Sequence, residues 1–296
     1  MPALGGITCV TIATPDIERS IRLYRDQLGY LPTARGPLGS ETARLWDKPQ
    51  LAQRDCALLY PQGNGPTAIR FVQSAPAPQY RAFHHMGWNA AELMVQDTDA
   101  VARHLAHSPF KVIGPPHDLS FTDKIRAMQV LGPANESLYL TCFKEKMVEF
   151  DVPDARYFID GVFIVILGGP SIASVNDFYA RHLGTQPAPA MKVLITVLSD
   201  AQGLPPDTQF ELAAIALQDK CFIEADAMPA ATLPRSADGP ELPPAIAMVS
   251  FLIDDLAATG LKFLSPPQRL EDAPYRGRLA AVAVGPAGEL IELMQR

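Results

Sequence analysis

Apolar positions alternate between two periods in the first thirty residues. ITCVTIA (7–13) reads as a strand, and apolar residues then recur at helical spacing, which predicts a helix with one buried face: Ile17, Ile21, Tyr24 and Leu28. Thr14 is expected to be the N-cap of this helix and Pro15 its first residue. Gly29 is expected to end the helix in the left-handed conformation.

The same signals return about 150 residues later. ATPDIERSIRLYRDQLG (13–29) aligns without gaps with GGPSIASVNDFYARHLG (168–184). LGPANESLYL (131–140) matches VGPAGELIEL (284–293), and VIGPPHDL (112–119) matches FLSPPQRL (263–270). Three matches in the same order at nearly one spacing indicate an internal duplication.

Each half divides again into two units of strand, helix and further strands. In the first half, a second helix is expected at 97–106, and the remaining strands near ETARLW (41–46), CALLYP (56–61), TAIRFV (67–72), AAELMV (90–95), HDLSF (117–121), KIRAMQV (124–130) and SLYLTCF (137–143). In the second half, strands are expected near FIVIL (163–167), VLITVL (193–198), ELAAIAL (211–217), CFIEAD (221–226), AIAMVSFLI (245–253) and ELIELM (289–294). We predict two domains, 1–146 and 157–296, each of two modules, joined by a linker at 147–156.

Composition narrows the classes of function. The net charge of −7 argues against a nucleic-acid partner, because no basic excess is present to neutralise phosphates. The longest apolar runs are too short to span a bilayer, so no membrane partner is expected. The four cysteines are scattered, which favours a reducing, cytoplasmic setting. A small-molecule ligand is the expected partner, and a homodimer remains open.

The chain resembles the vicinal oxygen chelate superfamily, which includes glyoxalase I, bleomycin-resistance proteins and extradiol dioxygenases. The strand–PD–helix–LYRDQLG opening, GPANESLYL and GPAGELIEL carry the resemblance over essentially the whole chain. It implies an α+β fold of four βαβββ modules, paired within each domain into two half-open barrels.

The resemblance also implies metal-binding positions on the first and last strand of each module. The first-strand positions are Cys9, Ala90, Ile164 and Met248, and the last-strand positions are Arg70, Tyr139, Glu224 and Glu292. None is histidine, so the usual two-histidine, one-carboxylate metal site is not expected, nor is any other cofactor. A divalent metal remains open, with Glu224 and Glu292 as its ligands.

Strand alternation predicts what else faces each hollow, because residues two apart share a face. In the first half, Arg70, Glu92 and Tyr139 are expected to face one hollow. Arg70 could bind a substrate oxyanion there while Glu92 or Tyr139 moves a proton. The alternative is a structural Arg70–Glu92 ion pair.

In the second half, Glu224 and Glu292 are expected to face an apolar hollow. Two carboxyls in such a site should titrate apart, which suits acid–base catalysis. The alternative is a structural pair of Glu224 with Arg276 or Arg278. Four further residues are candidates for substrate binding: Cys9, His85, Trp88 and His117.

These patterns favour an enzyme that acts on a small oxygenated or aromatic molecule by proton transfer, as an isomerase or lyase, without the usual metal site. Two alternatives remain. One is a binding protein of the bleomycin-resistance type, and the other is a metal-dependent glyoxalase- or dioxygenase-like enzyme with relocated ligands.

Overall fold

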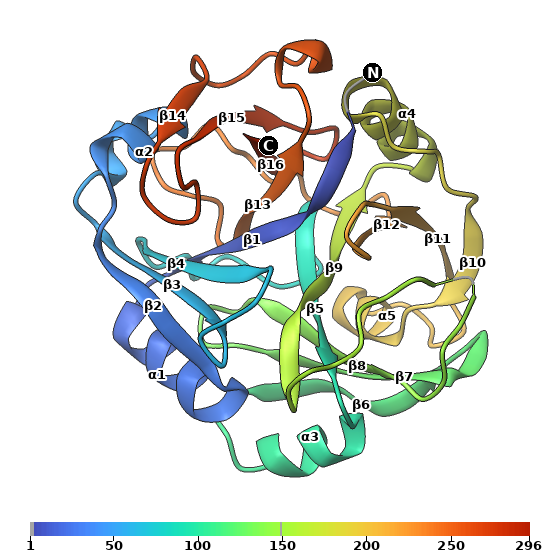
Figure 1. The fold of residues 1–296 in the computed structure, drawn as a ribbon. Coiled ribbons are helices and arrows are strands. Elements are labelled where there is room, and N and C mark those ends of the chain that lie inside the picture. Colours follow the sequence, from blue (N-terminus) through green and yellow to red (C-terminus); the bar gives the residue numbers. More distant parts are fainter. Residues whose placement is uncertain (1–2, 149) are drawn as a thin grey trace.

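The computed structural model describes residues 3–148 and 150–296 of the chain. Residues 1–2 of the predicted first domain and residue 149 of the predicted linker lie outside the described residues. Within the described ranges the chain forms sixteen strands, five α-helices and two short 3-10 helices, arranged as four modules (Figure 1).

The first two modules contain the following elements: β1 (Leu4–Thr14), α1 (Ile17–Leu28), β2 (Tyr30–Pro37), α2 (Ser40–Leu45), η1 (Pro49–Leu51), β3 (Asp55–Pro61), β4 (Ala68–Gln73), β5 (Gly87–Val95), α3 (Thr98–Leu105), β6 (Lys111–Leu119), β7 (Thr122–Leu131) and β8 (Ser137–Phe143). The last two modules contain β9 (Ile159–Gly169), α4 (Ile172–Leu183), β10 (Met191–Leu194), α5 (Thr196–Gln202), β11 (Gln209–Ala216), β12 (Phe222–Ala227), β13 (Ala245–Ile253), η2 (Ala257–Thr259), β14 (Gln268–Leu270), β15 (Arg278–Val284) and β16 (Leu290–Gln295).

The strands form two eight-stranded sheets. The first has the order β14-β15-β16-β13-β1-β4-β3-β2, and the second has the order β10-β11-β12-β9-β5-β8-β7-β6. The predicted α+β fold of four modules in two curled sheets is confirmed. The predicted pairing is wrong, because module one joins module four and module two joins module three. Neither 1–146 nor 157–296 closes a sheet by itself.

Pairing between the first strands of the modules decides this arrangement. Strand β1 runs antiparallel to β13, with Val10 opposite Val249, and β5 runs antiparallel to β9, with Ala91 opposite Val165. All four first strands are almost entirely buried and mostly apolar, so each offers a similar kind of edge to a partner. Local pattern sets the face of each side chain but not which module a strand joins.

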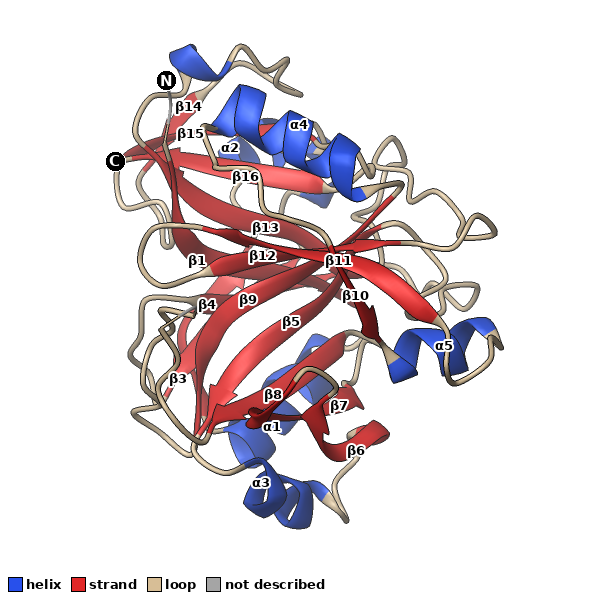
Figure 2. Ribbon diagram, turned by 90° about the vertical axis from the view of Figure 1, so that its right-hand side faces the viewer, coloured by secondary structure: helices blue, strands red, loops and turns tan. Residues whose placement is uncertain are grey.

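One hydrophobic core joins the two sheets, and the strands fan out from it between α4 at one end and α1 and α3 at the other (Figure 2). Val10, Leu93, Val165 and Phe251 point into this shared core. Trp88 lies at its centre, against Phe251, with Nε1 donating to the carbonyl of Leu290 at 2.8 Å. The alternate positions of the same strands face the hollow side of each sheet, as the alternation predicted.

The helix starts refine the sequence prediction. The N-cap of α1 is Asp16, whose side chain accepts from the backbone N–H of Arg19 at 2.9 Å, so the assignment of this role to Thr14 is wrong. Gly29 ends the helix with φ of +71°, as predicted, and Gly184 ends α4 in the same way with φ of +69°.

The duplication extends to individual hydrogen bonds. Tyr24 of α1 donates to the buried carboxyl of Glu136 at 2.8 Å, and Tyr179 of α4 donates to Glu289 at 3.1 Å. Each glutamate also accepts from the backbone N–H two residues before it, at 2.7 Å from Ala134 and 2.8 Å from Ala287. Glu136 and Glu289 are the shared glutamates of the GPANE and GPAGE motifs, and they tie each helix to the following module.

Candidate functional site

The hollow of the first sheet is filled by protein. The segment predicted as a strand at 41–46 is instead α2, and Trp46 at its end is fully buried among side chains such as Leu45, Met248 and Leu270. The prediction of a strand at E-T-A-R-L-W is therefore wrong. This segment is helical, and its apolar side is buried by packing into the hollow and not by pairing in a sheet.

A hydrogen-bonded ion pair lies beneath Trp46. Arg70 of β4 and Glu292 of β16 are buried and pair at 2.8 Å between Nη2 and Oε2. The guanidinium also donates to Thr11 Oγ1 at 2.9 Å and to the Tyr275 hydroxyl at 3.1 Å, and it stacks 4.6 Å from the centre of the Trp46 ring.

Both carboxylate oxygens of Glu292 also accept hydrogen bonds from neighbouring side chains. The carboxylate accepts from Trp46 Nε1 at 2.8 Å, from the Tyr275 hydroxyl at 2.7 Å and from the Ser250 hydroxyl at 2.5 Å. Burial raises the pKa of Glu292, but Arg70 and these hydrogen bonds outweigh burial and hold the pKa below its ordinary value. Glu292 is therefore ionised and fully paired, which leaves it no free proton to exchange.

This pair replaces two groupings predicted from the sequence. Arg70 does not share a hollow with Glu92 and Tyr139, and Glu224 does not share one with Glu292, because each predicted set is split between the two sheets. The alternative metal pair of Glu224 and Glu292 is wrong for the same reason. A surface cavity of about 270 Å³ reaches Arg70 and Tyr275 from the β2 side, but the polar atoms of both are already engaged.

The hollow of the second sheet is open. It contains a cavity of about 290 Å³, near the lower end of the ~300–1,000 Å³ typical of small-molecule sites. Its walls come from β5 to β12, from the start of α5 and, through Phe150, from the segment between β8 and β9. Apolar side chains make up most of the lining: Leu119, Phe121, Ile125, Phe143, Phe150, Ile164, Met191, Val193, Leu194, Ile195, Val197, Leu212 and Phe222.

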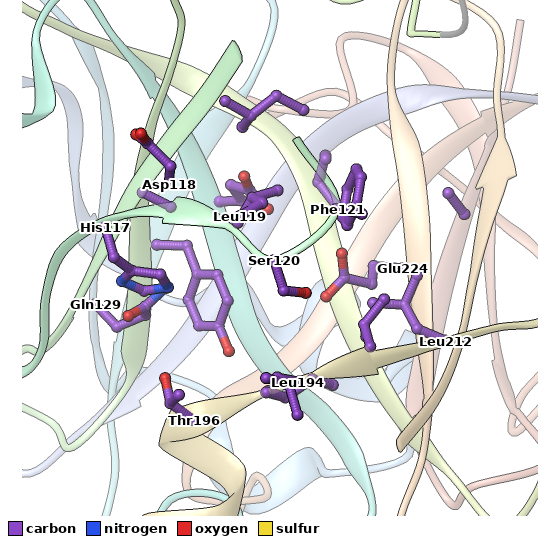
Figure 3. A pocket seen from close by; sticks show the side chains of 18 of the residues that line it. His117, Asp118, Leu119, Ser120, Phe121, Gln129, Leu194, Thr196, Leu212 and Glu224 are labelled. Atoms are coloured by element: carbon purple, nitrogen blue, oxygen red, sulfur yellow. The ribbon is translucent and has the colours of Figure 1, made fainter. Parts of the chain in front are cut away.

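Carboxyl groups from two strands meet at this cavity. Glu92 of β5 and Glu224 of β12 line it, and Figure 3 shows the Glu224 carboxyl pointing inward, across from Gln129 and His117. Asp226 follows two residues after Glu224 on the same face of β12 and is only 3% exposed. Strands β5 and β12, which flank β9 in the sheet, thus bring three acids together beside a mostly apolar wall.

Burial shifts the titration of these acids toward and above neutrality. It raises the pKa of Glu92 to about 7, and burial together with the Glu92 charge raises the pKa of Asp226 to about 8. Burial and the two neighbouring acids also raise the pKa of Glu224 well above its ordinary value. Because the three interact, they titrate as a group, and at pH 7 part of the group keeps its protons.

Several polar atoms around the cluster have no hydrogen-bond partner. Tyr139 lies directly opposite Glu92 in the parallel β5–β8 pair, and Gln129 lies opposite Tyr139 in the β7–β8 pair. The Tyr139 hydroxyl, Gln129 Oε1 and Asp226 Oδ1 are all buried and unpaired. Buried polar atoms normally have partners, so the unpaired Gln129 and Tyr139 atoms, on side chains that line the cavity, are available to bond a ligand there.

The four residues predicted to bind substrate lie in different places. His117 of β6 lines the mouth of the cavity, with Nδ1 at 2.8 Å from the carbonyl oxygen of Pro115. Trp88 belongs to the core between the sheets. His85 lies outside the cavity, stacked on Tyr80 with ring centres 5.3 Å apart. Cys9 is fully buried under the first sheet, where burial raises its thiol pKa to about 12.

Sequence reasoning missed Asp226, Gln129 and Phe150. Asp226 had a usable signal, because it follows Glu224 by two residues on one strand and must share its face. Gln129 and Phe150 had none, since their approach to the cavity depends on the curl of the sheet and on the path of the segment after β8.

The residues present do not fit the metal site of the vicinal oxygen chelate superfamily, which the sequence resembles. In the part of the chain that the structure describes, no three His, Cys, Asp or Glu side chains are grouped so as to hold a metal ion. The cluster offers carboxyls without imidazole, whereas the two-histidine, one-carboxylate site requires two rings.

Comparison with known proteins agrees with this architecture. No protein-family model and no curated protein matches the sequence. Among solved structures, glyoxalase I from Zea mays is similar with a TM-score of 0.66 at 16% identity, over 99% of this chain and 93% of that one. A putative dioxygenase from Bacillus subtilis is similar with a TM-score of 0.63 at 13% identity, over 99% and 86%.

These likenesses confirm the fold that the sequence motifs predicted. The chain has the fold of glyoxalase I from Zea mays and of the putative dioxygenase from Bacillus subtilis. One of its hollows is filled by α2 and Trp46 over an ion pair, and the other is lined by acids. In residues 3–148 and 150–296, no helix is both long enough and apolar enough to cross a membrane.

Stability should fall as the pH rises from 5 to 8. Five buried carboxyls have pKa values raised in the folded state, so the folded chain holds protons that the unfolded chain has released: Glu92, Glu136, Glu224, Asp226 and Glu289. The stabilising contribution is complete below the unfolded pKa of about 4 to 4.5. It is lost as the pH rises through the folded values, which are about 7 for Glu92, Glu136 and Glu289 and about 8 for Asp226. The lowered pKa of His85 has the opposite effect, but it is a single group.

Melting temperature measured in steps across this range tests the expectation. The fall should be smaller in the Glu136→Gln/Glu289→Gln variant, which removes two of the five groups. A melting temperature that rises steadily from pH 5 to pH 8 would contradict it.

Proposed function

We propose that the protein is an enzyme that transfers protons on a small oxygenated molecule with an apolar or aromatic body, bound in the cavity of the second sheet. The observation that carries this proposal is the cluster of Glu92, Glu224 and Asp226 at an otherwise apolar cavity. Carboxyls with pKa values near the working pH are effective as both general base and general acid, because each form is populated.

The positions of the groups support a division of roles. Glu92, with a pKa of about 7, would accept a proton from a carbon next to a substrate carbonyl. The unpaired Tyr139 hydroxyl, opposite Glu92 in register, would donate a hydrogen bond to the carbonyl oxygen as negative charge develops. Glu224 in its protonated form would return a proton to a second atom, completing an isomerisation, or protonate a leaving group, completing an elimination.

Arg70 and Glu292 take no part in this proposal. Their polar atoms are bonded to each other and to Thr11, Tyr275, Ser250 and Trp46, so a substrate would have to displace those partners. Both residues have a structural role in the first sheet, whose hollow is filled by α2 and Trp46. The homodimer, the cytoplasmic setting and the lack of a nucleic-acid partner remain predictions.

Deuterium uptake tests the proposal even while the product is unidentified. A library of small aromatic and aliphatic carbonyl and hydroxyl compounds would be incubated with the protein in deuterium oxide and followed by mass spectrometry. A proton-transfer enzyme should introduce deuterium at one carbon of its substrate, and the Glu92→Gln variant should not.

A second candidate function is non-catalytic binding, which the apolar wall of the cavity favours. A binding protein would raise its melting temperature with a compound while leaving that compound free of deuterium and chemically unchanged. That pattern for every compound that binds would overturn the enzymatic proposal.

A further inference from the structure

We infer that the ligand of this cavity carries a protonated amine on a compact apolar body. The inference rests on the ligand site of the proposed function and adds the chemical class of the molecule that occupies it. Three observations carry it: the charge of the groups around the cavity, the kind of atoms left unpaired there, and the aromatic side chains in its wall.

The charge around the cavity is one-sided. Its titratable groups are Glu92 from β5, Glu224 from β12, Tyr139 from β8, and His117 with Asp118 from β6. Asp118 is already paired with Arg126 and Lys144, whereas Glu92 and Glu224 have no cation in the described lining. The described lining from β7, β9, β10, β11 and α5 adds no titratable side chain, and no described Lys or Arg lines the cavity. The opposite arrangement occurs in the first sheet, where Glu292 is neutralised by Arg70 at 2.8 Å. An ammonium group would supply the missing positive charge.

The unpaired atoms also call for a donor. Gln129 Oε1 is a buried acceptor without a donor, on a side chain that is 4% exposed and lines the cavity. A protonated primary amine offers three donors and no acceptor. A carboxylate ligand would leave this acceptor unpaired and would repel the acids, and a lone carbonyl would add a further acceptor. An ammonium therefore satisfies groups that oxygen-only ligands leave unsatisfied.

The wall suits a cation with an apolar body. Phe121, Phe143, Phe150 and Phe222 line the cavity together with Tyr139. Aromatic rings attract a cation over their faces, and their area excludes water from an apolar group. The volume of about 290 Å³ limits the body to a small molecule.

A matched series of probes tests the inference: benzylamine, benzyl alcohol and benzoate, titrated by calorimetry in the presence of EDTA. At pH 8 benzylamine should bind about tenfold or more tightly than benzyl alcohol, because its hydrogen bonds to the acids are charge-assisted. Benzoate should not bind.

Binding should also release protons, because an ammonium favours the ionised form of each acid beside it. The benzylamine affinity should therefore rise between pH 6 and pH 8, by up to about tenfold per pH unit for each proton released. The measured enthalpy should differ between phosphate and Tris buffers, since each buffer takes up the released proton with a different heat.

Two variants locate the effect. Glu224→Gln should weaken benzylamine binding about tenfold or more and reduce the proton release. Glu289→Gln removes a buried carboxyl whose pKa is also raised but which lies away from the cavity, and it should leave binding unchanged.

The outcomes separate this inference from the proposed function. Binding of benzyl alcohol or benzoate as tight as that of benzylamine would overturn the amine inference and leave the ligand site intact. Benzylamine binding that Glu224→Gln does not weaken would overturn it as well. If no probe binds, the amine inference falls, while deuterium uptake from the compound library still decides the enzymatic proposal.

Discussion

The Glu92→Gln variant is expected to lose activity by about 10²- to 10⁴-fold in kcat/KM, the usual contribution of a positioned general acid or base. Gln keeps the shape and polarity of the side chain but cannot accept or release a proton near neutral pH. Glu92 is 7% exposed and faces the cavity opposite Tyr139, so the substitution removes a positioned base. Initial rates on a compound that incorporates deuterium measure the loss.

The control for this experiment is Glu289→Gln. Glu289 has a pKa of about 7, as Glu92 does, and is also buried. It lies away from the cavity, in the turn before β16, where it accepts a hydrogen bond from Tyr179 of α4. It should keep turnover within a small factor. If Glu92→Gln and Glu224→Gln both keep normal rates, the assignment of proton transfer to this cluster is wrong.

The Arg70→Met variant is expected to lose about 3–5 kcal/mol of unfolding free energy. Methionine removes the charge that pairs with Glu292, and the carboxylate would remain buried without that cation. In the wild type, the lowered pKa of Glu292 adds stability that is present above its unfolded pKa of about 4.5 and is lost as the pH falls through the folded value. Urea unfolding at pH 7 measures the loss.

A second substitution should recover much of it. In Arg70→Met/Glu292→Gln the buried charge is gone, while the Gln oxygen still accepts from Trp46 and Tyr275, so the double variant should be more stable than Arg70→Met. Arg126→Met serves as the matched control, since Arg126 pairs with Asp99 and Asp118 at the surface and should cost at most about 1 kcal/mol. Equal losses for the Arg70→Met and Arg126→Met variants would contradict the structural role of this ion pair.

The two sheets explain how one duplicated scaffold holds two different interiors. In the first sheet, α2 and Trp46 occupy the hollow, and the buried charges form one closed network. In the second, the helix after β10 is placed at the rim, where Thr196 and Val197 only line the cavity. Equivalent strand positions therefore form a closed ion pair in the first sheet and line an open cavity in the second, depending on where a short helix packs.

The amino-acid sequence by itself determined the duplication, the starts and ends of α1 and α4 to within a few residues, and the face on which each strand residue lies. These features follow from spacing along the chain, because side chains alternate on a strand and recur about every 3.6 residues on a helix. The sequence also predicted the fold, which is confirmed, and the inward positions of five side chains: Arg70, Glu92, Tyr139, Glu224 and Glu292.

Only the tertiary structure decided which of those residues meet. Pairing of β1 with β13 and of β5 with β9 places Arg70 beside Glu292, and it places Glu92 with Tyr139 near Glu224. The four first strands offer similar apolar edges, so their partners depend on the packing of the whole chain and not on any local pattern. The same holds for Trp46, whose segment becomes the end of a helix because a hollow is there to receive it.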